Sequence, residues 1–410
     1  MKTPPLPLLS TIALASPLAL NLFVPAMPDA AQALGTDIST IQLTFTAYLL
    51  TLAIGQLLAG PLADFYGRRP VVISGLLLHS VGSVMALLAS DVSWLIAGRV
   101  LQAAGGSTAM SLARTIVIDV YGRDGASAKM GYMVMSVAIA QSIAPTLGGF
   151  LALWYGWQSS FVIPVLLALL VAGLAWRLLP ETCQQRTPEL RVGRVLGQYR
   201  QLLGSTEYLG YAFSTTWIAA AFYLFVGSAP YLVVQNLGGN SAEFGSWFMA
   251  VSLAFMAGSF LSTRLASRFS IDQVVLIGNS LSLLGGLVLF LAVSINWLSL
   301  AALFLPMAVV TFGRGLSQPN AQSAAIACAT GNAGTASGLM GCIQLVCGSA
   351  LAQLTPVLMA HGLAYLMLCL ALAPALAMVS HGIAIRQRHH ANRTDAASQR
   401  QTTATASNSR

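Results

Sequence analysis

Apolar residues occur in long, uninterrupted runs along this chain, and short polar stretches separate them. Each run is about 20 residues long, enough for a helix to cross a hydrocarbon layer of ~30 Å. Polar and apolar positions do not alternate within the runs, which excludes a transmembrane β-barrel. We therefore expect an all-α membrane protein with twelve transmembrane helices. Their expected ranges are 6–27, 40–62, 71–89, 94–118, 130–153, 159–179, 208–234, 244–263, 274–293, 298–325, 335–358 and 364–385.

One long polar segment lies near the middle of the chain and divides these helices into two sets of six. Two similar halves with a substrate path between them are typical of many secondary transporters. The expected units are an N-terminal six-helix bundle at 1–179, a basic cytoplasmic linker at 180–206, a C-terminal six-helix bundle at 207–385 and a disordered cytoplasmic tail at 386–410. The linker arginines are Arg186, Arg191, Arg194 and Arg200.

Composition agrees with a membrane protein. Only 8% of the 410 residues are charged, and 56% are hydrophobic; soluble domains carry roughly 25% charged residues. The net charge of +8 does not indicate nucleic-acid binding. With both termini in the cytoplasm, the Lys and Arg residues of the loops all fall on the cytoplasmic side, as the positive-inside rule requires. We expect a monomeric, multi-pass protein of the bacterial inner membrane, in contact with its lipid bilayer.

The sequence shows no pattern typical of an enzyme, a metal site or a nucleotide site. The five cysteines lack the spacing of a zinc site, and four of them lie in apolar runs. No Gly-x-x-x-x-Gly-Lys loop is present to bind ATP, and no nucleophile stands in a pattern with a base. The sequence therefore predicts neither an enzyme nor a metal or cofactor site.

The segment 59–72 joins two expected helices through a very short charged turn. Gly67 allows the positive φ that a tight turn needs. Asp64 can pair with a nearby cation or sit at the N-terminus of an adjacent helix. Such a pair predicts a gating latch that holds the two halves in one state and breaks in the other. The alternative is a plain topological anchor. A weaker version follows at 264–275, with two arginines and Asp272 but no Arg-Arg pair.

Several motifs resemble those of one transporter family. The run Gly60-Pro-Leu-Ala-Asp-Phe-Tyr-Gly-Arg-Arg69 resembles the signature loop of the major facilitator superfamily, and 99–106 is similar to its fourth-helix motif. Pro145, Gly148 and Gly149 belong to a run similar to the fifth-helix motif of its proton-coupled antiporters. Shorter runs resemble the Bcr/CflA branch of drug exporters, which includes phenicol exporters. These runs are 41–44, 55–57, 113–121 and 156–157.

The resemblance implies the major facilitator fold and a function. That function is export of small, mostly apolar drugs, phenicol-like or multidrug, in exchange for protons by alternating access. The alternative is a metabolite exporter or importer of the same fold with weak or no proton coupling. Branch members often carry an acid in the first helix, where this chain has Asn21. A non-transporting receptor or scaffold is a third possibility, which the intact motifs and short loops disfavour.

Three charged or titratable residues within expected helices are candidates for coupling: Arg99, Arg114 and His79. A charge at the centre of a membrane helix costs at least ~2.5 kcal/mol, so it generally faces a cavity or a partner. Arg114 has two further options, a pair with Asp119 or snorkelling to the interface, and His79 has the alternative of a packing role. Arg314 belongs to no family motif, and a structural role is favoured for it.

The substrate pocket is expected near the membrane midplane, between the halves. Pockets of broad specificity combine aromatic side chains with a few hydrogen-bonding groups. The residues predicted to face it are Asn21, Phe45, Tyr48, Gln141, Trp217, Tyr223, Asn320 and Gln344.

Overall fold

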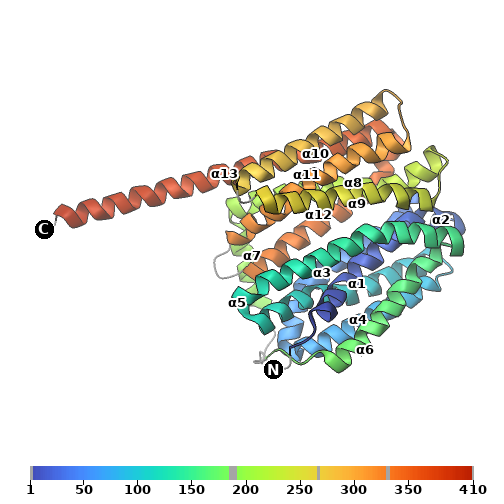
Figure 1. The fold of residues 1–410 in the computed structure, drawn as a ribbon, viewed down its shortest axis with the longest axis horizontal. Helices are drawn as coiled ribbons and strands as arrows, with labels where there is room; N and C mark the ends of the chain where they lie inside the picture. The colour runs from blue at the N-terminus through green and yellow to red at the C-terminus, as the bar shows by residue number, and fades with distance from the viewer. Residues whose placement is uncertain (1–2, 184–191, 266–267, 329–332, 409–410) are drawn as a thin grey trace.

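A computed structural model describes the chain except for residues 1–2, 184–191, 266–267, 329–332 and 409–410 (Figure 1). Helices form nearly all of the described part. Those of the first half are α1 (Leu6–Phe23), α2 (Met27–Ala33), α3 (Ile38–Tyr66), α4 (Arg68–Leu87), α5 (Val92–Tyr155) and α6 (Val162–Leu178). Helix α7 (Val192–Leu203) leads to α8 (Thr206–Tyr231), α9 (Ser241–Leu265), α10 (Ile271–Ser294), α11 (Leu300–Ala327), α12 (Ala333–His361) and α13 (Leu363–Asn408).

The helices form two layers that correspond to the two halves of the chain. Figure 1 shows α1–α6, in blue to green, beside α8–α13, in yellow-green to red. We call the end where α1 begins and α13 leaves the bundle the proximal end, and the end that holds α2 the distal end. In the described part, eleven helical segments are long and apolar enough to cross a membrane. This arrangement confirms the expected all-α, two-bundle architecture.

The remaining expected crossing is the first part of α5, which carries Arg99 and Arg114 and is therefore less apolar. A polar loop was expected at 119–129, but helix continues on both sides of a single break at Gly122. Gly122 has φ of +68°, which glycine adopts without the steric cost that other residues meet. One residue thus turns the chain from the fourth crossing into the fifth.

Two other segments differ from the expected ranges. The first crossing contains a 3₁₀ turn at Val24–Ala26, which includes Pro25, and then continues as α2 to Ala33. Helix α13 continues to Asn408, although disorder was expected from residue 386. No Gly or Pro follows Gly382 to stop this helix. Of the expected linker arginines, Arg186 and Arg191 lie outside the described residues.

Polar residues cap the starts of several helices. Asp37 accepts hydrogen bonds from Ser39 Oγ at 2.5 Å and from the Thr40 amide at 3.1 Å, which begins α3. These bonds favour the ionised carboxylate and lower the pKa of Asp37. Asp91 caps α5 in the same way, and Ser270 forms a capping box with Gln273 at α10. The polar loops therefore define where the apolar helices start.

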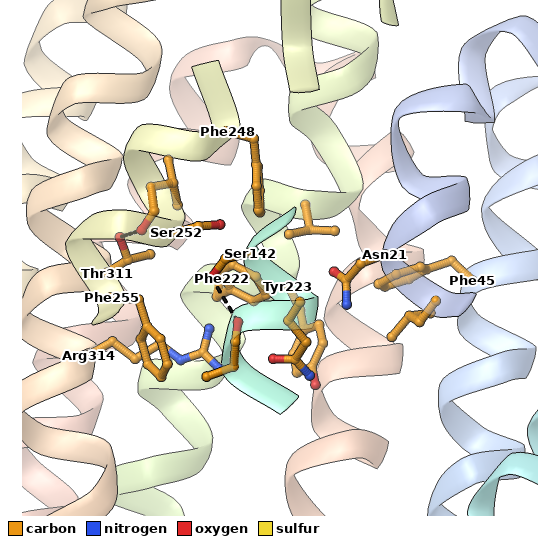
Figure 2. A pocket seen from close by; sticks show the side chains of 15 residues that line it. Asn21, Phe45, Ser142, Phe222, Tyr223, Phe248, Ser252, Phe255, Thr311 and Arg314 are labelled. Atoms are coloured by element: carbon orange, nitrogen blue, oxygen red, sulfur yellow. Dashed lines mark hydrogen bonds between the residues drawn. The ribbon is translucent and has the colours of Figure 1, made fainter. Parts of the chain in front are cut away.

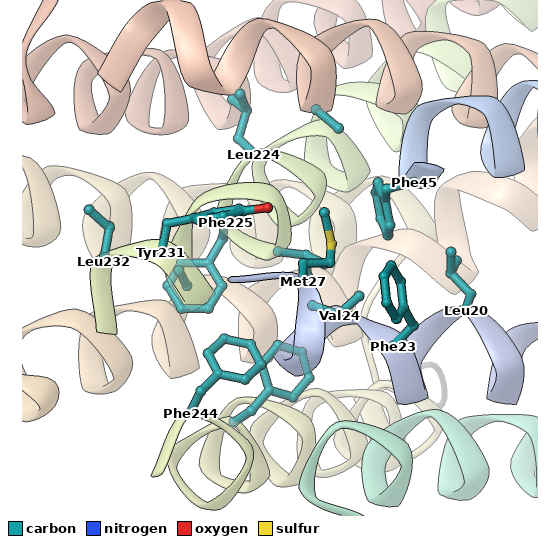
Figure 3. Close-up of a cluster of buried hydrophobic side chains, with 14 of the residues drawn as sticks. Leu20, Phe23, Val24, Met27, Phe45, Leu224, Phe225, Tyr231, Leu232 and Phe244 are labelled. Atoms are coloured by element: carbon teal, nitrogen blue, oxygen red, sulfur yellow. The ribbon is translucent and has the colours of Figure 1, made fainter. Parts of the chain in front are cut away.

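The largest buried apolar cluster joins the two halves. Phe23, Met27 and Phe45 from the first half pack in one cluster with Phe225 and Phe244 from the second. Figure 3 shows these side chains around the turn between α1 and α2. The hydrogen bonds that join the halves among the described residues also lie in the distal half of the bundle. They connect Thr46 with Gln353, Ser39 with Gln353, Thr146 with Gly245, and Ser241 with Gly149.

Candidate functional site

A pocket lies between the halves, near the middle of the helices. Helices α1, α3, α5, α8, α9 and α11 supply its walls (Figure 2). Its aromatic lining is Phe45, Phe222, Tyr223, Phe248 and Phe255, and its polar lining is Asn21, Gln141, Ser142, Ser252, Thr311 and Arg314. The volume is about 80 Å³, room for a few water molecules. A drug-sized molecule therefore requires the walls to move apart.

Half of the predicted substrate-binding residues line this pocket: Asn21, Phe45, Gln141 and Tyr223. Asn21 donates from Nδ2 to the Pro17 carbonyl at 2.8 Å. Pro17 and Asn21 lie one turn apart in α1, which continues as helix through both residues. Asn21 is thus partly used for the helix that carries it, and its amide oxygen remains available.

The other four predicted residues lie outside the pocket. Tyr48 is fully buried, and its hydroxyl lies 2.7 Å from Ser16 Oγ. Asn320 donates to Ser262 Oγ at 2.6 Å, which joins α11 to α9. Gln344 donates to Thr215 Oγ1, and Trp217 packs against the central apolar cluster. These contacts hold neighbouring helices together.

Arg314 lines the pocket, although no motif predicted a role for it there. Its Nε donates to Gln318 Oε1 at 2.7 Å, one turn further along α11. The centre of its guanidinium lies 4.3 Å from the ring centroid of Phe222 and 5.1 Å from that of Phe255. No carboxylate among the described residues forms an ion pair with it. The one sequence feature that indicated a functional position at Arg314 was the presence of an arginine within an apolar helix.

Arg99 lies in a separate buried site within the first half. Its guanidinium has no exposed surface and lies 4.2 Å from the centroid of the Tyr48 ring. Phe23 and Phe161 are also within 6 Å of it, at 5.3 and 5.8 Å. One terminal nitrogen donates to Gln102 Oε1 at 2.7 Å and to the Ala19 carbonyl at 3.3 Å. Aromatic faces and neutral oxygens thus take the place of a counterion.

His79 belongs to the same polar network. Its Nδ1 lies 2.7 Å from the Gln102 carbonyl, so Nδ1 carries the proton and Nε2 is the free nitrogen of the neutral ring. Nε2 is buried without a partner among the described residues. Gln102 Nε2 also donates to Ser83 Oγ at 2.7 Å. His79 and Arg99 are therefore linked through a single residue, Gln102.

Arg114 makes no hydrogen bond or ion pair with the described residues, so the option of a pair with Asp119 is not realised. Asp119 instead accepts from Arg68 Nε at 3.3 Å and from Thr182 Oγ1 at 3.2 Å. The carboxylate lies five positions beyond Arg114, which places it on a different face of the helix. Asp119 thus interacts with the charged turn between α3 and α4.

The charged turn between α3 and α4 forms a compact ion-pair network. Gly67 has φ of +103°, a conformation that side chains strongly disfavour. Arg68 pairs with Asp64 at 2.6 Å and with Asp119 at 3.3 Å, so it joins the end of α3 to the part of α5 just before Gly122. Arg69 donates to the Trp176 carbonyl at 2.5 Å, which adds α6 to the network.

Glu181 completes this network, and the sequence did not indicate its part. Its two carboxylate oxygens accept from the backbone amides of Arg68 and Arg69 at 2.8 and 3.3 Å. A carboxylate at a helix N-terminus satisfies free amides and favours the helix dipole. All these partners lie in α3, α5, α6 or the segment just after α6. In this conformation the turn braces the first half, and the predicted latch between halves remains a prediction.

The second half has a related cluster around Asp272. Its carboxylate accepts from Tyr211 Oη at 3.0 Å and pairs with Arg388 at 3.3 Å. His381 Nε2 lies 3.7 Å from the same carboxylate. Arg264 stacks over Phe260, and α13 supplies the basic residues beside Asp272. The start of the expected tail is therefore packed against the bundle.

The glycines of the fifth-helix motif lie where helices approach one another closely. A Cβ on Gly148 would come within 2.0 Å of the Leu22 carbonyl, and one on Gly149 within 2.2 Å of the Ser241 carbonyl. Thr146 Oγ1 donates to the Gly245 carbonyl at 2.7 Å, and the Pro145 carbonyl faces Gly245. The motif thus packs α5 against α1 and, across the halves, against α9.

Comparison with known families decides what this arrangement is. The family model described as Major Facilitator Superfamily matches residues 9–353. The chain belongs to the Major Facilitator Superfamily. Its long apolar helices and its bacterial relatives make this transporter a multi-pass bacterial membrane protein. Membership supports a transport role rather than catalysis.

Several relatives of this transporter are named as resistance proteins or their homologs. It is 34% identical over 313 residues to the chloramphenicol resistance protein of Pseudomonas aeruginosa, covering 75% of this chain and 72% of that protein. It is 26% identical over 356 residues to a bicyclomycin resistance protein homolog of Haemophilus influenzae, covering 84% and 87%. It is 28% identical over 343 residues to multidrug resistance protein D of Escherichia coli, covering 83% and 85%. These names are consistent with the resemblance to the Bcr/CflA branch.

Solved structures of other transporters share the fold of this one. A D-xylose–proton symporter superposes with a TM-score of 0.71 at 13% identity, covering 92% of this chain and 96% of that one. A bacterial homolog of the human lysosomal transporter Spinster gives a TM-score of 0.70 at 16% identity, covering 92% and 95%. At such low identity the likeness concerns the fold alone.

Proposed function

We propose that this major facilitator transporter exports small drugs across the bacterial inner membrane in exchange for protons. The observation that carries the proposal is the pocket between the halves, with five aromatic side chains and a few hydrogen-bonding groups. This composition suits the loose recognition of varied apolar molecules. The names of the relatives, which include chloramphenicol and multidrug resistance proteins, support drugs as the substrate class.

The proposed orientation places the proximal end in the cytoplasm. The charged turn with Arg68 and Arg69 lies there, and so do α7 and the exit of α13, in agreement with the positive-inside rule. The hydrogen bonds between the halves gather at the distal end. The conformation is then closed toward the outside, and rocking of the halves opens the pocket to each side in turn. A monomer in the lipid bilayer suffices for this cycle.

The proposed proton route runs through the buried network of the first half. Among the described residues, no Asp, Glu or His lines the pocket, so the lining offers no side chain that could carry a proton. Asn21, which stands where branch members often have an acid, cannot take up a proton. His79 has a free Nε2 and is linked through Gln102 to Arg99 and thus to α1. Protonation of His79 next to this cation would cost free energy. A conformation that moves His79 away from Arg99 would bind the proton more readily, so proton binding would favour that conformation.

Purified transporter in proteoliposomes tests the proposal directly. We expect uptake of radiolabelled chloramphenicol when the lumen is acidic, and its loss when an ionophore collapses the pH gradient. Transport that ignores the gradient would favour the second candidate function, a metabolite exporter or importer with weak or no proton coupling. The absence of a carboxylate from the described pocket lining favours testing it. His79→Gln separates the two parts of the proposal. We expect it to retain gradient-independent drug exchange while losing accumulation driven by the pH gradient.

A further inference from the structure

We propose that the pocket selects apolar aromatic molecules that carry one anionic acceptor group, such as a carboxylate or sulfonate, and that Arg314 binds this group. The inference rests on the proposed transport function and makes its substrate class more specific. The family resemblance implies small, mostly apolar drugs, whereas the structure places a cation in the wall of the pocket.

The guanidinium of Arg314 is held so that one edge is available to a ligand. Phe222 and Phe255 lie within stacking distance of it, at 4.3 and 5.1 Å. Of its five N–H donors, the one on Nε is used, by Gln318. The terminal nitrogens make no hydrogen bond among the described residues, and Figure 2 shows the group pointing toward the middle of the pocket. A planar fork held in this way matches a carboxylate or sulfonate.

The charges around the pocket favour an anion. Its other polar lining consists of neutral amides and hydroxyls, and no described carboxylate lines it. The carboxylates that form ion pairs, Asp64, Asp119 and Asp272, lie at the proximal end and have other partners. A cation inside a membrane bundle without a counterion is costly. A bound anion would relieve this cost, whereas an organic cation would increase it.

Arg99 serves as an internal comparison. It also lacks a carboxylate partner, but its side chain has no exposed surface and three aromatic rings surround it. A ligand in the pocket cannot reach that guanidinium. Arg314 is therefore the cation that a substrate meets, and the aromatic residues beside it, among them Phe248 and Tyr223, contact the apolar part of the molecule.

The test uses three probes with the same aromatic body and different charge: 1-naphthoate, 1-naphthamide and 1-naphthylmethylammonium. Binding to the full-length transporter in lipid nanodiscs is measured by calorimetry, with empty nanodiscs as the blank. We expect naphthoate to bind at least about tenfold more tightly than naphthamide, a difference of about 1.4 kcal/mol, and the ammonium probe to bind most weakly. Equal affinity for the three probes would overturn the proposal.

Variants of Arg314 separate charge recognition from structure. Arg314→Met should abolish the preference for naphthoate and leave naphthamide binding within about threefold, about 0.65 kcal/mol. Arg314→Lys, which retains the charge, should keep part of the preference even if the Met variant does not fold. Arg177→Met removes an exposed cation on α6 and should change nothing. An equal loss of all three probes in both Arg314 variants would instead mean that Arg314 only packs against its aromatic neighbours.

Two measurements on the wild-type protein, probe binding and chloramphenicol transport, distinguish this proposal from the proposed drug export. If wild-type protein prefers naphthoate but moves no chloramphenicol in proteoliposomes, the anion site stands and drug export fails. If it moves chloramphenicol but shows no preference among the probes, export stands and the anion site fails.

Discussion

Two arginines within membrane-spanning helices, one buried and one half-buried, define the chemistry of this transporter at the scale of single residues. Both are held by aromatic rings and a glutamine, and neither has a carboxylate partner among the described residues. Arg99 is sealed within the first half, whereas Arg314 faces the pocket. Identical side chains thus have different roles, one in holding helices α1, α3 and α5 together and the other in meeting a ligand.

We expect Arg99→Lys to lose most drug transport even though the charge is retained. Lysine has no planar group to stack on Tyr48, and a desolvated cation–π contact of this kind is worth about 2 kcal/mol. Transport in proteoliposomes and the thermal unfolding temperature should both fall, while Arg177→Lys on the exposed face of α6 leaves both unchanged. Full activity of Arg99→Lys would remove the guanidinium geometry from the mechanism.

The sequence predicted which residues are unusual better than it predicted what they contact. Arg99 and His79 were identifiable because polar groups are rare in apolar helices. Tyr48 was assigned to the pocket but packs on Arg99, and Arg314 was assigned a structural role but lines the pocket. A difference of one helical turn or of a small rotation decides such contacts, and these depend on how the helices cross.

The turn between α3 and α4 illustrates what happens at the scale of elements. Its motif predicted a tight charged turn, and the positive φ of Gly67 agrees with that. The partners of the turn come from α5, α6 and Glu181, which are distant in sequence. The predicted role as a latch between the halves remains open. The structure supports a second role, in which the turn makes the first half a rigid body.

Gly67→Ala should destabilise the transporter, because alanine at φ of +103° and ψ of +155° meets a steric cost of about 1–3 kcal/mol. Gly60→Ala is the matched control in the same motif. It lies within α3, and a Cβ there has no neighbour within 4 Å, so the expected change is neutral or slightly stabilising. Thermal unfolding in detergent measures both variants. Equal unfolding temperatures would show that the turn tolerates a different backbone conformation.

Helix ends were harder to predict than the helices themselves. The apolar runs placed the crossings, but the fourth and fifth were expected to be joined by an eleven-residue loop, and Gly122 makes that turn alone. The amphipathic α7 was not expected within the linker. Local backbone freedom and contacts with other helices determine these boundaries, and hydropathy does not report either.

At the scale of the whole molecule, contact between the halves is concentrated at the distal end. Gly149 permits α5 to approach Ser241 on α9, and Thr146 bonds Gly245 nearby. Thr46 and Ser39 make the corresponding contacts with Gln353 on α12. The sequence predicted two halves with a pocket between them, but not which end is closed, because alternating conformations share one sequence.

Gly149→Ala should shift the transporter toward conformations that are open at the distal end. The added methyl would lie 2.2 Å from the Ser241 carbonyl, so α5 and α9 must separate for it to fit. Gly131→Ala is the control on the same helix, since a Cβ there meets nothing within 4 Å. Hydrogen exchange followed by mass spectrometry reads the effect without added labels. Amides near the start of α9 and the end of α5 should exchange faster in Gly149→Ala than in the wild type or the control. Unchanged exchange in Gly149→Ala would mean that the closed distal end does not depend on this close approach.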